Sequence, residues 1–167
     1  MNARIVQISV SRGGVPKTAV PAAQVTADGV EGDAQRNRVL HGGPERAVCL
    51  YSIEAIERLR AEGHSIAPGS IGENVTVEGL DWSAVVPGDH LLLGEQVLVQ
   101  VTRYTTPCLN IKGSFMDGEV ARVSQKRHPG WSRVYARVLV PGTIRRDDPV
   151  RPLDEIEAAE LTAAASR

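Results

Sequence analysis

The sequence is poor in aromatic residues, cysteine and net charge, and each shortage excludes a class of protein. Aromatic side chains make up only 4% of the 167 residues, so any core must be packed from aliphatic side chains. The two cysteines, Cys49 and Cys108, form no C-x-x-C pair, which argues against a disulfide-rich scaffold and a structural zinc site. A formal net charge of -1 gives no support for general binding to nucleic acid or to a membrane surface.

Long apolar runs are also missing. No stretch approaches the roughly 20 apolar residues that cross a bilayer. Residues 1–10 lack a long hydrophobic region and a small-residue cleavage pattern, so we do not expect a signal peptide there. These absences indicate a soluble, cytoplasmic protein with reduced thiols. Apolar residues still make up 42% of a chain of one-domain length, which is enough for a real core.

Short β-strands dominate the pattern that is present. The segments are rich in β-branched residues, partly alternate between apolar and polar, and end at Gly or Pro. Gly94-Glu95 predicts a hairpin turn between two of them. Strands are predicted over residues 5–10, 46–51, 74–77, 89–93, 96–104, 135–140 and 150–153.

Helices are expected in two places. Ser52 suits the N-cap of a helix that extends to about Glu62, and Gly63 ends it. Asp154 suits the cap of an Ala- and Glu-rich terminal helix. We therefore expect residues 1–153 to form one domain and residues 154–167 a helical tail. Many short strands without long alternating helices predict a mainly β fold, either a barrel or a sandwich.

The first group of unusual residues lies between residues 31 and 48. Asp33 follows a glycine, and His41-Gly42-Gly43 precedes a predicted strand. Paired glycines let backbone N–H groups approach a ligand closely and can form an anion-binding nest. The alternative is that these glycines only turn the chain into the next strand, and spacing alone favours that alternative.

The second group is Gly72-Glu73-Asn74, just before a strand. An Asn side chain both donates and accepts hydrogen bonds, which suits the edge of a heterocycle such as a pterin. The alternative is a structural loop in which the Asn binds its own backbone.

The third group surrounds Cys108, which follows a proline at a predicted strand end. Arg103 and Lys112 flank it, and nearby positive charge favours the thiolate that binds soft metals. The alternative is a buried, inert cysteine. Cys49 fits that alternative better, because it lies in mid-strand among aliphatic residues.

Taken together, these segments resemble the MOSC domain family, named after the C-terminal domain of molybdenum cofactor sulfurases. The family pattern is G-D, then H-G-G with A-V shortly after, then G-E-N before a strand, then P-C. Each motif is weak alone, but the ordered set is specific and extends over residues 5–153. The matching positions are Gly32-Asp33, His41-Gly42-Gly43 with Ala47-Val48, Gly72-Glu73-Asn74 and Pro107-Cys108.

The resemblance implies a MOSC-type β-barrel with a few peripheral helices and a pocket for the molybdenum cofactor (Mo-molybdopterin). Cys108 would be the catalytic residue and the ligand to the metal. Many relatives have Arg and Lys where this chain has Thr105 and Asn110, so Arg103 and Lys112 would supply charge from displaced positions. Arg36 and Arg38 are further candidates for the cationic groups. The implied cofactor-binding residues are Asp33, His41, Gly42, Gly43, Arg46, Gly72, Glu73, Asn74, Arg103, Thr105, Asn110 and Lys112.

Three functions are compatible with this resemblance. The first is a molybdenum-dependent reductase of N-hydroxylated compounds that receives electrons from a separate donor protein, since no cluster-like cysteine set is present. The second is a sulfur or cofactor carrier with a persulfide on Cys108. The third is a scaffold that has lost the cofactor. Pyridoxal phosphate is a family association only, and without an aminotransferase-like portion the chain would not make a persulfide by itself.

Overall fold

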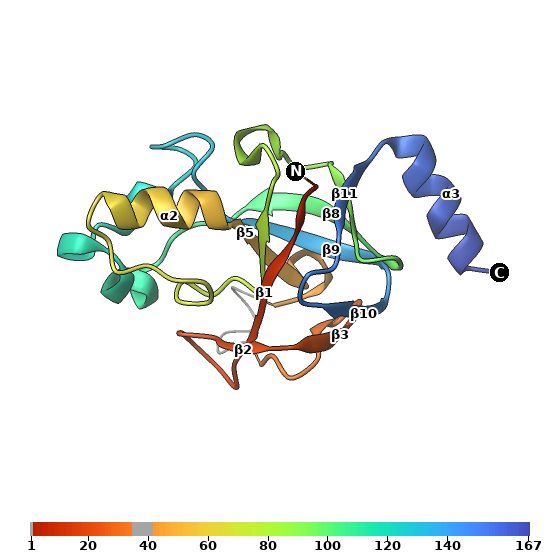
Figure 1. Ribbon diagram of the computed structural model, residues 1–167, viewed down its shortest axis with the longest axis horizontal. Helices are drawn as coiled ribbons and strands as arrows, with labels where there is room; N and C mark the ends of the chain where they lie inside the picture. Colours follow the sequence, from red (N-terminus) through yellow and green to blue (C-terminus); the bar gives the residue numbers. More distant parts are fainter. Residues whose placement is uncertain (1, 35–41) are drawn as a thin grey trace.

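The computed structural model describes residues 2–34 and 42–167, and these form two β-sheets with helices at the periphery (Figure 1). The larger sheet has eight strands in the order β11-β7-β8-β9-β5-β6-β1-β2. Its strands are β1 (Arg4–Val10), β2 (Thr18–Val20), β5 (Val48–Ser52), β6 (Val75–Glu78), β7 (His90–Leu93), β8 (Val97–Tyr104), β9 (Val134–Val140) and β11 (Val150–Leu153). The smaller sheet has the order β10-β3-β4, with β3 (Ala22–Thr26), β4 (Gly29–Val30) and β10 (Gly142–Arg145).

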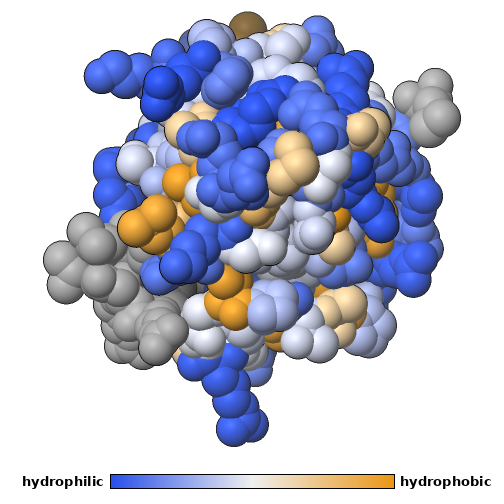
Figure 2. All heavy atoms as spheres, turned by 90° about the vertical axis from the view of Figure 1, so that its left-hand side faces the viewer, coloured by the Kyte–Doolittle hydropathy of each residue, from blue (hydrophilic) through white to orange (hydrophobic). Residues whose placement is uncertain are grey.

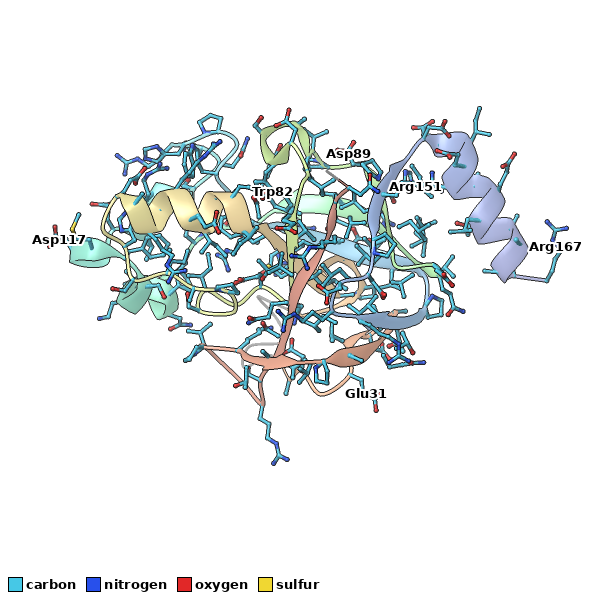
Figure 3. The ribbon with its side chains drawn as sticks, in the orientation of Figure 1. Glu31, Trp82, Asp89, Asp117, Arg151 and Arg167 are labelled. Carbon is cyan, nitrogen blue, oxygen red and sulfur yellow. The ribbon has the colours of Figure 1, made fainter. Side chains whose placement is uncertain are left out.

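Helices lie at the two ends of the molecule. The helix α2 (Ile53–Ala61) and the 3-10 turns η3 (Leu109–Ser114), η4 (Met116–Gly118) and η5 (Val120–Val123) lie at one end, and α3 (Glu155–Ala165) lies at the other (Figure 1). The labelled Asp117 and Arg167 mark these opposite ends in Figure 3. Shorter 3-10 turns are η1 (Pro44–Arg46) and η2 (Trp82–Ala84). No helix in residues 2–34 and 42–167 is both long and apolar enough to cross a membrane.

The sequence predictions for α2 and α3 are confirmed, together with their caps. The Oγ of Ser52 accepts the N–H of Ala55 at 3.2 Å and begins α2. Asp154 forms a capping box with Glu157 at the start of α3. These local hydrogen bonds satisfy backbone donors that a helix N-terminus would otherwise leave unpaired.

The mainly β prediction is confirmed, but the prediction of a closed barrel is wrong. Closure would require the edge strands of the large sheet, β11 and β2, to hydrogen-bond to each other. In the described residues β2 pairs only with β1, and β11 pairs only with β7. The chain leaves the large sheet after the short β2, and β3 enters the smaller sheet instead, so both sheets stay open.

Most strand pairs are antiparallel, but the pair β5–β6 is parallel, and this pair brings the segments of the site together. The strands β5 and β6 pair in parallel, and α2 makes the crossover between them. Because of this crossover, the loop that precedes β6 returns beside β5, next to the end of β1. Segments that are far apart in the sequence therefore meet at this end of the sheet.

The core is aliphatic, as the composition predicts. All five residues of β5 are buried, as expected for a central strand covered on both faces. Ile56 and Leu59 are fully buried on the inner face of α2. A second, smaller cluster under α3 contains Leu98, Val140, Leu153 and Ala158. At the α2 end, the surface is mostly hydrophilic with small, separate hydrophobic patches (Figure 2).

Candidate functional site

A cavity of about 180 Å³ lies where the loops after β1, before β6 and after β8 meet. A common pocket requires the segments around Asp33, His41 to Gly43, Gly72 to Asn74 and Cys108 to converge. Residues from the neighbourhoods of Asp33, Gly72 and Cys108 contribute to the wall of this cavity, whereas Gly42 and Gly43 do not. Both cysteines and two cations also face it. The lining residues are Gly14, Val15, Lys17, Ala34, Cys49, Ile71, Gly72, Asn74, Thr106, Cys108, Asn110, Ile111, Arg133 and Tyr135.

The two cysteines are both free and both border the cavity, but they differ in burial. Cys108 is partly exposed and immediately precedes η3. Cys49 is 5% exposed, and burial raises the pKa of its thiol to about 11. The burial of Cys49 matches the expectation, whereas its contact with the cavity was not predicted. At neutral pH Cys49 is therefore a protonated thiol in the cavity wall.

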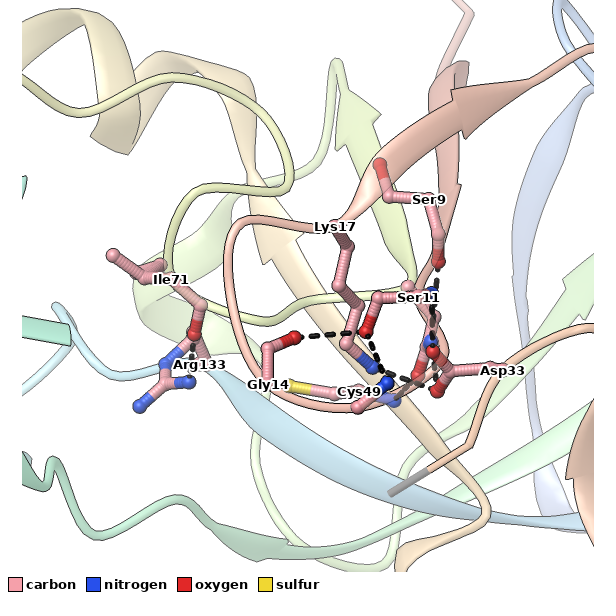
Figure 4. Close-up of polar contacts among 10 residues, drawn as sticks. Ser9, Ser11, Gly14, Lys17, Asp33, Cys49, Ile71 and Arg133 are labelled. Carbon is pink, nitrogen blue, oxygen red and sulfur yellow. Dashed lines mark hydrogen bonds and ion pairs between the residues drawn. The ribbon is translucent and has the colours of Figure 1, made fainter. Parts of the chain in front are cut away.

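Asp33 lies behind the cavity wall and connects three segments through contacts of its carboxylate (Figure 4). Its Oδ1 accepts the N–H of Ser11 at 2.9 Å. Its Oδ2 lies 2.7 Å from Nζ of Lys17 and accepts Nδ2 of Asn74 at 2.9 Å. The Asp33 side chain is 4% exposed, so these partners compensate its charge almost entirely within the protein.

Asn74 lines the cavity, but its amide is committed to the protein. Its Nδ2 donates to the carbonyl of Ser9 at 3.2 Å as well as to Asp33, and its Oδ1 accepts the N–H of Cys49 at 3.0 Å. With both amide hydrogens used, Asn74 fixes β1, β5 and β6 together. The geometry therefore favours the structural alternative for this residue over contact with a heterocycle edge.

Glu73 is fully buried and does not line the cavity. Its Oε1 accepts the N–H of Gly69 at 2.7 Å and the Oγ1–H of Thr76 at 3.2 Å, while Oε2 has no hydrogen-bond partner among the residues that the structure describes. Burial raises the pKa of this carboxyl, and the bonds to Gly69 and Thr76 only partly oppose that shift. Glu73 therefore braces the loop that carries Gly72.

The positive charge of the cavity comes from residues that the sequence analysis did not select. Arg133, 6% exposed, and Lys17, whose side chain is 10% exposed, both line the wall. The expected cations Arg103 and Lys112 are exposed and lie outside it. Arg46 also lies outside, with its guanidinium 5.7 Å from the centre of the Tyr135 ring.

The two positions that depart from the family pattern have different surroundings. Asn110 is exposed and lines the cavity. Thr105 is buried behind the wall, and its N–H donates to the carbonyl of Arg133 at 3.0 Å. Arg133 thus lies directly beside Thr105 on the neighbouring strand segment.

The glycine motif near residue 42 lies next to the cavity. Gly42 and Gly43 line a separate hollow with Asp33 and Ala34, and Ala34 also borders the cavity. The predicted residues His41, Arg36 and Arg38 lie outside the described residues.

Tyr135 completes the wall from β9. Burial raises the pKa of its phenol to about 12, so Oη keeps its proton at neutral pH. The position follows from the sheet register, in which Tyr135 pairs with Cys49 of β5 on one side and Arg103 of β8 on the other. Alternation along the predicted strand 135–140 could have suggested this placement, but only with the strand order known.

The described residues give no support for a metal site made by protein ligands alone. In residues 2–34 and 42–167, no three His, Cys, Asp or Glu side chains come together as candidate metal ligands. A metal at Cys108 would need further ligands from a bound group.

Comparison with known proteins connects this geometry to a family. The MOSC domain model matches residues 37–151. The chain belongs to the MOSC domain family. This family is associated with binding of the molybdenum cofactor.

Curated relatives are longer than this chain. Protein YiiM of Escherichia coli (strain K12) is 32% identical over 148 residues, covering 85% of this chain and 64% of YiiM. The uncharacterized protein YflK of Bacillus subtilis (strain 168) is 32% identical over 136 residues, covering 81% of this chain and 60% of YflK. The chain therefore spans less than two thirds of either relative.

Solved structures agree with the fold. The crystal structure of YiiM from Geobacillus stearothermophilus has a TM-score of 0.71 at 26% identity, covering 91% of this chain and 75% of that one. The crystal structure of YiiM from Escherichia coli has a TM-score of 0.69 at 25% identity and covers 100% of this chain and 79% of that one. These MOSC-type neighbours support the mainly β architecture.

Proposed function

We propose that the cavity binds the molybdenum cofactor, that Cys108 is the protein ligand to the metal, and that the loaded protein reduces N-hydroxylated compounds. The observation that carries the proposal is a partly exposed free thiol in the wall of a cavity that also holds cationic groups. A distant relative, a protein of Gibberella moniliformis named "Reductase", is 31% identical over 134 residues, covering 77% of this chain but 23% of that protein.

The residues of the cavity fit such a group chemically. Cys108 offers a soft sulfur ligand, and Thr106 and Asn110 offer polar groups nearby. The buried Nε of Arg133 has no hydrogen-bond partner in the described residues. A buried donor without an acceptor is uncommon in a finished site and is consistent with a ligand that completes it.

The chain would bind, orient and protect the cofactor, which supplies the two-electron redox chemistry when bound. Cys108 would bind the metal of the cofactor and so hold that end of it in place. Cys49 would not compete as a thiolate ligand, because its pKa of about 11 keeps it protonated at neutral pH. Electrons would come from a separate donor protein, since two cysteines cannot hold an iron–sulfur cluster.

Cys108→Ser tests this proposal. A hydroxyl is a harder and far less acidic ligand than a thiol, so the variant should lose bound molybdenum and reductase activity together. The measurements are metal content after production with ample molybdate and turnover of an N-hydroxylated substrate with a supplied electron donor. Full molybdenum content and full turnover in Cys108→Ser would show that the cysteine-ligand mechanism is wrong.

Cys49→Ser is the matched control for this experiment. It should retain molybdenum and lose only stability, by roughly 1–3 kcal/mol if the new hydroxyl finds no partner in its buried place. The measurements are metal content and urea unfolding.

The partial exposure of Cys108 also suits the carrier function, in which its sulfur would hold a persulfide. In that case the wild type should show no reductase turnover with any supplied donor. Mass spectrometry of the peptide containing Cys108 should instead detect one added sulfur atom.

A further inference from the structure

Arg133 carries a positive charge that forms no ion pair in the described part of the chain. Its side chain is buried, at 6% exposure, and it forms no ion pair within residues 2–34 and 42–167. Its Nη1 donates to the carbonyl of Ile71, while its Nε is buried and has no hydrogen-bond partner in that part of the chain. A buried charge is costly without a counter-charge, so a buried guanidinium without an ion pair indicates a missing anion.

Neighbouring carboxylates do not supply that anion. Asp33 is already paired with Lys17 at 2.7 Å and accepts Asn74 and Ser11 as well. Glu73 is the other buried carboxyl nearby. Burial opposes its negative charge more strongly than Arg133 favours it, so its pKa is raised, and the two side chains form no ion pair. Lys17 and Asp33 therefore compensate each other, and the charge of Arg133 remains.

The Arg133 side chain borders the cavity. Arg133 lies among the lining residues, with its Nη1 3.8 Å from where a Cβ on Gly72 would stand. Cys49 experiences the positive charge of both Arg133 and Lys17, so both cations lie near this part of the cavity wall (Figure 4). A ligand in this cavity would meet the guanidinium of Arg133, whereas the charge of Lys17 is already compensated by Asp33.

We propose that Arg133 makes this cavity a receptor for an oxyanion, such as a phosphate or carboxylate group. The planar guanidinium presents its N–H donors in a fixed fork that matches two oxygens of such a group. This inference rests on the proposed function only where it names the source of the anion. The anion is either the phosphate of the bound cofactor or an acidic group of the substrate.

Inorganic phosphate is the probe, measured by titration calorimetry on protein produced in a host that cannot make the cofactor. The wild type should bind phosphate, and Arg133→Met should bind it about tenfold more weakly or worse, as expected for loss of a charge-assisted hydrogen bond. Arg60→Met, an exposed α2 residue outside the cavity, is the control and should bind like the wild type.

Arg133→Lys is a second variant that tests the proposal even if Arg133→Met does not fold. It keeps the charge but loses the fork, so its affinity for phosphate should fall between those of the wild type and Arg133→Met. Absence of phosphate binding in the wild type, or equal binding by all Arg133 variants that fold, would overturn the proposal.

Repeating the titration on cofactor-loaded protein identifies the source. Binding to the cofactor-free form alone assigns Arg133 to the phosphate of the cofactor, and binding to both forms assigns it to the substrate. The two hypotheses fail separately. If phosphate binding is absent while Cys108 still retains molybdenum, only the oxyanion site is refuted. If Cys108→Ser keeps molybdenum while phosphate binding depends on Arg133, only the proposed function is refuted.

Discussion

Single residues around the cavity divide into those that face it and those that hold the facing residues in place. Cys108, Asn110 and Arg133 face it, whereas Asp33 and Glu73 act from behind. The supporting residues are as polar as the facing ones, so residue type alone does not separate the two groups. Their hydrogen-bond partners do.

Glu73→Gln should change how stability depends on pH. Burial raises the pKa of the folded Glu73 carboxyl above 4.5, the value for an unperturbed carboxyl. As pH rises above about that value, the unfolded state loses this proton first, so wild-type stability falls until the folded group also ionises. Gln keeps the oxygen that accepts Gly69 and Thr76 but cannot ionise. The melting temperature of the variant should therefore rise relative to the wild type with increasing pH.

Melting curves at several pH values from 4 to 8 check this prediction. Glu31→Gln is the control, because Glu31 is exposed and should show no such trend. A difference in melting temperature between Glu73→Gln and the wild type that stays constant with pH would contradict it.

At this scale the sequence predicted the neighbourhood of the site better than its chemistry. The motifs around Gly72 and Cys108 pointed to the cavity because both lie in loops that the fold brings together. Arg133 and Lys17 were missed because they are distant from Cys108 along the chain. Charge was assigned by proximity in sequence, to Arg103 and Lys112, whereas the sheet order decides which cations face the cavity.

Elements meet at the site through loops that approach very closely. The loop before β6 and the loop after β1 contact each other at Gly69, whose carbonyl accepts the N–H of Lys17 at 2.9 Å. Gly69 has φ +85°, and a Cβ there would lie 2.6 Å from the carbonyl oxygen of Lys17. Only glycine allows this backbone conformation and this approach without strain.

Gly69→Ala should force the two loops apart and destabilise the protein by roughly 1–3 kcal/mol, measured by urea unfolding. Gly113→Ala is a suitable control, because a Cβ at Gly113 meets nothing within 4 Å and its φ is not positive. Equal unfolding midpoints for the two variants would rule out the close approach as the reason for glycine at position 69.

The elements that the sequence predicted share strong local signals, and the missed ones lack them. The strands β1, β7, β8 and β9 are rich in aliphatic residues and were found within a few residues of their ends. By contrast, β2 and β3 are short, contain alanine and are separated by Pro21, so their strand character comes from their partners. The predicted strand over residues 135–140 does end before Pro141, but the strand β10 that begins at Gly142 and pairs with β3 was not predicted.

The whole molecule has one main core and a small separate cluster beneath α3. Ala158 is the buried residue of α3, and it packs with Leu98, Val140 and Leu153. We therefore propose that residues 154–167 form a tail and that residues 1–153 fold as a domain without it.

A chain ending at Leu153 should therefore fold and still bind molybdenum under the proposed function. Loss of the small cluster should lower stability by about 1–3 kcal/mol, measured as a lower unfolding midpoint. Asp154→Ala in the full chain is the comparison, since it removes only the capping box at a cost of about 1 kcal/mol. An unfolded truncated chain would show that the tail belongs to the domain.

The position of β1 has a consequence for how the chain folds. This first strand lies between β6 and β2, and Arg4 also bridges to Pro149 near the other end of the chain. Pairings between residues so distant in sequence require large loops to close first, which makes folding slow. The cavity wall gathers residues from β5, β9 and loops across the chain, so it is complete only after these closures. Ligand binding is therefore possible only late in folding, when the whole molecule has reached its folded state.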